Sequence, residues 1–67
     1  MQKLEDKAEL KLVAIELSKT LGFCQGFLGK PFDVEFVKEY PQEWKLSMLR
    51  DYRTEYAIGK ELAENDS

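Results

Sequence analysis

The sequence predicts an all-α fold, an antiparallel helical hairpin with a short helix at the bend, which we expect to dimerise. Good helix formers fill the chain from Leu4 to about Leu28 without a proline. A short aromatic stretch at residues 32–40 follows, and a second long helical run extends from Pro41 to about Ala63. These observations indicate two long helices and a short one.

A chain of 67 residues forms one domain at most. A domain of this size buries only about 60% of the surface that its unfolded chain exposes, so self-association or a partner would add stability. We expect residues 1–3 and 64–67 to fray, because both ends are polar and terminal.

The first predicted helix carries two apolar stripes, whereas a surface helix usually shows one. One stripe holds Leu4, Ala8, Leu12, Ile15, Gly22 and Gly26, and the other holds Leu10, Val13, Leu17, Leu21, Cys24 and Leu28. Two stripes favour contact with the chain itself on one side and with a second subunit on the other. The alternative is a three-helix packing within one chain.

An aromatic–glycine element occurs twice, as Phe23-x-x-Gly26 and as Tyr56-x-x-Gly59. Glycine inside a helix costs about 1 kcal/mol relative to alanine, so repeated glycines need a reason. Close approach of a second backbone is such a reason. We therefore expect the helices to pack through four glycines: Gly22, Gly26, Gly29 and Gly59. Gly29 also suits a helix C-cap, since Lys30 precedes a proline.

In the short stretch, Phe32, Phe36 and Tyr40 recur every fourth residue, and Asp33 is placed to cap a turn. We expect these rings to close one end of the core. The alternative is an exposed aromatic patch for a partner.

The second long helix should begin at Pro41, a residue favoured at the first helical position. Its apolar face collects Trp44, Met48, Leu49, Tyr52, Tyr56, Gly59, Leu62 and Ala63, and a basic cluster of Arg50, Arg53 and Lys60 lies elsewhere on the helix. Trp, Tyr and Arg are the usual hot-spot residues of protein interfaces. The candidate partner-binding residues are Trp44, Arg50, Tyr52, Arg53, Tyr56 and Lys60.

The basic cluster has two interpretations. Arginines beside tyrosines can form an RNA or phosphate surface, because rings stack on bases and guanidinium groups bind phosphate. Alternatively, the cations pair with an acidic strip of Glu5, Glu9 and Glu16. The formal net charge of −3 favours ion pairing over nucleic-acid binding.

Most chemistry is disfavoured by composition. The chain has no histidine, which excludes Ser-His-Asp and Cys-His arrangements, and its one cysteine cannot build a four-ligand zinc site. Cys24 lies within an apolar stripe and is expected in the core. We expect no enzyme activity, cofactor, metal or small-molecule substrate. A single cysteine suits the reducing cytoplasm, and no apolar run is long enough to span a membrane.

One family resemblance is carried by Gly22-Phe23-x-x-Gly26-x-x-Gly29-Lys30-Pro31, then Trp44, then Tyr52-Arg53-x-x-Tyr56-x-x-Gly59. This pattern, over about Gly22 to Lys60, resembles that of ribosome modulation factor and related small phage proteins. The resemblance implies helices packed through glycines and binding to the ribosome. The chain departs from that family in being acidic and in having a longer first helix.

The expected function is therefore a small non-enzymatic regulator or inhibitor, of bacterial or phage type, which acts by docking a helical surface onto a protein partner. The alternative function is a ribosome- or RNA-associated factor that uses Arg50, Arg53 and Lys60.

Overall fold

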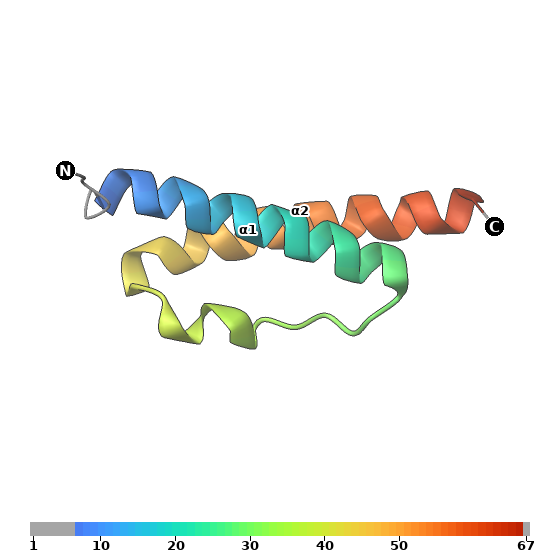
Figure 1. Cartoon of the computed structure of the whole chain (residues 1–67). Coiled ribbons are helices and arrows are strands. Elements are labelled where there is room, and N and C mark those ends of the chain that lie inside the picture. Colours follow the sequence, from blue (N-terminus) through green and yellow to red (C-terminus); the bar gives the residue numbers. More distant parts are fainter. Residues whose placement is uncertain (1–6, 67) are drawn as a thin grey trace.

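The computed structural model describes residues 7–66, which form two long α-helices and one short 3₁₀-helix. Helix α1 spans Lys7–Leu28, the 3₁₀-helix η1 spans Glu35–Glu39, and α2 spans Gln42–Asp66 (Figure 1). The all-α fold is confirmed, and the two long helices pack against each other. The predicted start at Leu4 and the expected fraying of residues 1–3 and 67 lie outside the described residues. Helix α2 extends to Asp66, beyond the end expected near Ala63.

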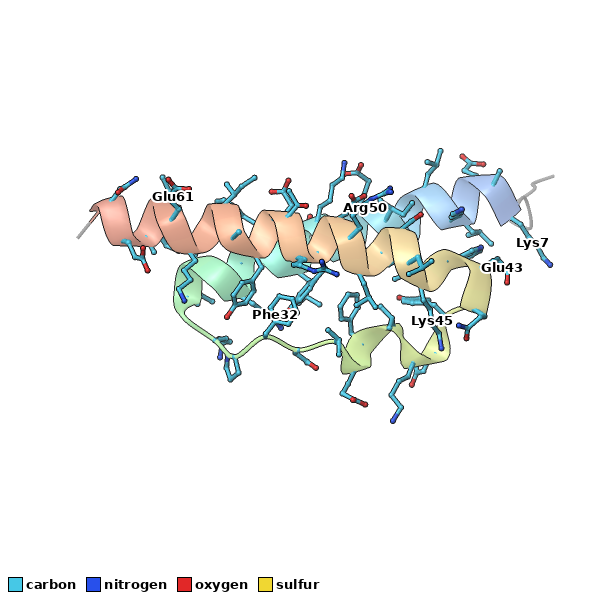
Figure 2. The ribbon with its side chains drawn as sticks, turned by 180° about the vertical axis from the view of Figure 1, so that it is seen from behind. Lys7, Phe32, Glu43, Lys45, Arg50 and Glu61 are labelled. Atoms are coloured by element: carbon cyan, nitrogen blue, oxygen red, sulfur yellow. The ribbon has the colours of Figure 1, made fainter. Side chains whose placement is uncertain are left out.

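The two long helices run in the same direction, so the expected antiparallel arrangement is wrong. Gly22 lies against the backbone of Tyr52, and Gly26 lies against that of Tyr56. Four residues forward along α1 therefore correspond to four residues forward along α2. Figure 2 agrees, because Lys7 and Glu43, near the starts of α1 and α2, lie at the same end of the molecule.

The parallel arrangement requires a long connection, which we call the return segment (residues 29–41). It leaves the end of α1, runs back beside the helix pair, includes η1 and reaches the start of α2 (Figure 1). Helices joined as an antiparallel hairpin need only a short loop. The length of the return segment is thus explained by the direction of α2.

Glycine ends α1 in a Schellman motif. Gly29 has φ of 74°, the left-handed region that glycine adopts without strain. The Lys30 N–H donates to the Gln25 carbonyl at 2.9 Å, and the Gly29 N–H donates to the Gly26 carbonyl at 3.2 Å. Apart from Gly29 itself and its two chain neighbours, no atom lies within 4 Å of the position that a Cβ of Gly29 would occupy. Gly29 is therefore a cap, and its predicted role in helix packing is wrong.

Local polar contacts define the return segment. The Asp33 carboxylate accepts a hydrogen bond from the Glu35 N–H at 2.9 Å, at the start of η1. Pro41 stands immediately before α2, and its carbonyl accepts from the Trp44 N–H at 3.0 Å. Asp33 thus closes a turn just before η1, whereas the N-cap residue of η1 is Val34, which makes no side-chain cap bond. Helix α2 begins one residue later than expected.

The core is small and lies where η1 covers the helix pair. Its buried cluster consists of Ala14, Val37 and Met48, with the partly buried side chains Ile15, Phe36, Tyr40, Trp44 and Leu49 packed around it. The Cα atoms extend over 48 × 22 × 13 Å, so the molecule is thin in one direction. A shape this thin leaves one side of each helix facing solvent.

Candidate partner-binding surfaces

The contact between α1 and α2 is made by small residues. The buried residues of α1 are Ala14, Ser18, Gly22 and Gly26, which we call the small-residue line. These positions repeat every four residues and therefore lie along one side of the helix. A Cβ added to Gly22 or Gly26 would come closer than 3.0 Å to a backbone carbonyl of α2.

Gly59 makes the reciprocal contact from α2. A Cβ at Gly59 would come closer than 3.0 Å to the Phe23 carbonyl oxygen and would lie 3.0 Å from the Phe27 nitrogen. The hydrogen that replaces Cβ in each packed glycine faces a carbonyl, which suits Cα–H···O contacts of about 0.5–1 kcal/mol each. Three of the four glycines predicted to pack thus lie at the helix contact: Gly22, Gly26 and Gly59.

Ser18 belongs to the same line although sequence analysis did not select it. Its side chain is completely buried, and its Oγ donates to the Ala14 carbonyl of its own helix at 3.0 Å. This bond satisfies the hydroxyl without a partner on α2. The signal in the sequence was size at a spacing of four, which a search for apolar side chains does not detect.

Tyr52, a predicted partner-binding residue, is fully buried. Its hydroxyl donates to Gln25 Oε1 and accepts from the Asp33 N–H at 2.9 Å, so it joins α1, α2 and the return segment. A side chain with 0% exposure offers no surface to a partner, and the predicted role of Tyr52 at an interface is wrong for this conformation.

Tyr56 is half-buried and also holds the return segment. Its hydroxyl donates to the Lys30 carbonyl. Phe32 reaches from the return segment toward the helices (Figure 2), and its ring meets the rings of Tyr52 and Tyr56 edge-on, with centroids 5.1 and 5.0 Å apart. The two tyrosines therefore bind the chain's own connection.

Trp44, a predicted partner-binding residue, lies at the border of the core. Its ring stacks on Tyr40 with centroids 6.4 Å apart, and it packs against the core, yet it is only partly buried.

The predicted basic cluster lies on the solvent side of α2. Leu46, Arg50, Arg53, Ala57 and Lys60 are all exposed and follow one another at helical spacing; we call them the outer ridge. Figure 2 shows Arg50 pointing away from the return segment. Leu46 is 83% exposed, the largest value among the large apolar side chains of the described residues.

The cations of the outer ridge are largely unpaired. Arg50 Nε lies 3.7 Å from Asp51 Oδ1, a weak contact at the surface. Within residues 7–66, Arg53 and Lys60 form no ion pair with the acidic strip, since Glu16 pairs instead with Lys19 at 3.4 Å. Glu5 lies outside the described residues.

The solvent side of α1 is apolar. Its exposed residues Leu10, Val13, Leu17, Thr20, Cys24 and Phe27 form what we call the exposed seam. Cys24 is exposed, so its predicted place in the core is wrong. The second stripe of the sequence is thus exposed except for Leu21, which is partly buried, and the predicted three-helix alternative is not adopted in this structure.

No group of three or more metal-ligating side chains gathers anywhere in the described part of the chain. Within the same residues, no helix is both long and apolar enough to cross a membrane.

Comparison with protein-family models, with curated proteins and with solved structures finds no match to this chain. The resemblance to ribosome modulation factor therefore stays a prediction.

Proposed function

We propose that this chain is a small non-enzymatic regulator that docks onto a protein partner through the outer ridge of α2. The observation that carries the proposal is the arrangement of exposed Leu46 beside cations that are largely unpaired within residues 7–66. Within residues 7–66, Arg53 and Lys60 have no ion-pair partner, so both cations are open to charges on another molecule. The matching partner surface is an apolar pocket with an acidic rim.

Energetic arguments support a role for each residue type. The exposed Leu46 supplies apolar area that gains free energy when covered. Arginine is enriched among interface hot spots, while cations at the rim mainly raise the association rate and fix orientation. Arg50 and Arg53 lie one turn apart, so a carboxylate cluster can reach both.

A protein partner is favoured over RNA. Base recognition on an open surface relies on stacking against aromatic rings. Tyr52 is buried and Tyr56 is held by Lys30, so neither ring beside the cations is free to stack. The net charge of −3 also opposes attraction to phosphates.

A reducing compartment such as the cytoplasm fits this role. Cys24 is exposed and is the only cysteine in the chain, so an oxidising environment would expose it to intermolecular pairing.

The test is affinity capture with immobilised parent and variant chains, followed by mass spectrometry. We expect a protein retained by the parent to be lost with Leu46→Asp and weakened at least tenfold with Arg50→Ala/Arg53→Ala. The matched control, Lys19→Ala/Lys38→Ala, removes the same charge from other faces and should retain the protein.

Nuclease treatment and salt separate the two macromolecular classes. Retention that survives nuclease and falls only modestly between about 50 and 200 mM salt supports a protein partner, because phosphate contacts weaken roughly 10³–10⁵-fold over that range. Capture that disappears with nuclease, or that the outer-ridge variants leave unchanged, contradicts the proposal.

A further inference from the structure

The exposed seam of α1 has the spacing of a coiled-coil interface. Its positions alternate in steps of three and four residues: Leu10, Val13, Leu17, Thr20, Cys24 and Phe27. This is the a/d pattern of a heptad repeat, which keeps one stripe facing a second helix. An apolar stripe of this kind gains no free energy while it faces water. The return segment does not cover it, because that segment lies on another side of α1 (Figure 1).

The surface of α1 is also shaped to receive side chains from a helix. An open groove on this side is lined by Glu9, Leu12, Val13, Glu16, Leu17 and Thr20. These residues form two successive four-residue holes, the first from Glu9 to Glu16 and the second from Val13 to Thr20. In a coiled coil each hole of this kind accepts one side chain of the facing helix.

We propose that a second copy of this chain covers the exposed seam, with the two α1 helices packed against each other in antiparallel orientation. Charge supports this orientation. The seam side carries Glu9 and Glu16 in its first half, whereas residues 20–29 contain no charged side chain. Antiparallel pairing places the acidic half of each copy against the uncharged half of the other.

The direction of the helices within one copy supports the same orientation. Since α1 and α2 are parallel, their helix dipoles add within a chain. In an antiparallel pair, the combined helix dipole of one copy points opposite to that of the other. A parallel pair would align all four helix dipoles.

The area is sufficient for a specific pair. Six large apolar side chains on this side of α1 are 41–64% exposed: Leu10, Leu12, Val13, Leu17, Phe27 and Leu28. At about 150–200 Å² for a fully exposed side chain, they present roughly 500 Å² per copy. Complete cover of these side chains in both copies would bury about 1,000 Å², the lower bound for a specific interface.

Sedimentation equilibrium tests the pairing. We expect the parent chain at about 100 µM, a concentration that populates even weak pairs, to sediment at twice its mass of 7.8 kDa. Leu17→Glu should sediment as a monomer with an unchanged helical circular dichroism spectrum, because Leu17 is 56% exposed and supports no core. The matched control, Leu46→Glu on the outer ridge, should remain paired. A monomeric parent, or a Leu17→Glu chain that stays paired, overturns the proposal.

The single native cysteine reports the orientation. Centred antiparallel pairing sets Cys24 opposite Val13 of the second copy, so Val13→Cys should give disulfide-linked pairs in high yield under mild oxidation with oxidised glutathione. The parent, with Cys24 alone, should crosslink much less. Rapid linking of Cys24 to Cys24 in the parent indicates parallel pairing and overturns the proposed orientation. Both readouts concern α1 only, so they stand or fall separately from partner capture by α2.

Discussion

Helices α1 and α2 differ in the size of the side chains that they bury, although each buries glycine where the two backbones meet. Helix α1 turns its small-residue line toward α2 and leaves Leu10, Val13 and Leu17 in solvent. Helix α2 buries Met48 and Tyr52 completely and exposes charged side chains. The comparison teaches that the packing face of a helix is not always its most hydrophobic face. Where backbones touch, size selects the residues, and the large apolar side chains are left for another surface.

The largest expected effect comes from adding volume to the small-residue line. Gly26→Leu places its side chain against the Tyr56 backbone, which cannot retreat as a flexible side chain would. We expect a loss of about 3 kcal/mol or more in the free energy of unfolding, measured by urea denaturation. The control Ala57→Leu adds similar volume on the exposed side of α2 and should be nearly neutral.

A smaller change, Gly26→Ala, tests the same contact through the sign of the change in the free energy of unfolding. In a helix without close neighbours, Gly26→Ala would stabilise by about 1 kcal/mol through helix propensity. Here we expect the clash with the α2 backbone to make the variant less stable than the parent. A stabilised Gly26→Ala chain would show that α1 does not pack through its glycines.

The next prediction concerns Tyr52, a large side chain that α2 buries completely. Tyr52→Phe removes the hydroxyl that Gln25 and the Asp33 N–H share, and leaves both without that partner. We expect a loss of about 1–3 kcal/mol in the free energy of unfolding. Tyr56→Phe, whose bond to Lys30 is exposed, should lose less than about 1 kcal/mol. Equal losses would mean that Tyr52 does not anchor the return segment.

Removing the hydroxyl from the small-residue line should matter little. The Ser18 Oγ bonds only within α1, so Ser18→Ala deletes a donor and its local bond together. We expect the free energy of unfolding to change by less than about 1 kcal/mol, since alanine also has the higher helix propensity. A thermal scan with a larger loss would indicate a contact of the hydroxyl with α2.

The smallest effect on stability is expected at the outer ridge. Arg53→Ala/Lys60→Ala should leave the free energy of unfolding within about 0.5 kcal/mol of the parent, because neither cation has an ion pair in residues 7–66. A clear loss of stability in urea titrations would mean that Arg53 and Lys60 stabilise the fold. Their exposure would then no longer support a role in partner binding.

Helix propensity predicted the helices. The cap at Gly29 and the close contact at Gly22, Gly26 and Gly59 were predictable because glycine is favoured where φ is positive or where backbones approach closely. The sequence did not predict the direction of α2. Propensity and periodicity are the same for either direction of a helix, and the signal was the length of the return segment, which exceeds what a hairpin loop needs.

The predicted positions of the site residues were less accurate than the predicted helices. Apolar periodicity assigned Cys24 to the core, and the hot-spot preference of tyrosine assigned Tyr52 to a partner; in the structure Cys24 is exposed and Tyr52 is buried. Which of two apolar stripes is buried depends on the neighbouring helix, and a single helix does not contain that information. Arg50, Arg53 and Lys60 were easier to place, since charged groups are rarely buried unless paired.

The parallel direction of the helices also determines how the chain can fold. Tyr52 follows Gly22 by 30 residues, and Tyr56 follows Gly26 by the same 30. In an antiparallel hairpin the first contacts close a short loop and later ones extend from it, whereas here contacts along the helix pair close loops of similar, large size. Docking therefore cannot zip outward from a turn, and the rate should depend on how well α1 and α2 form before they meet.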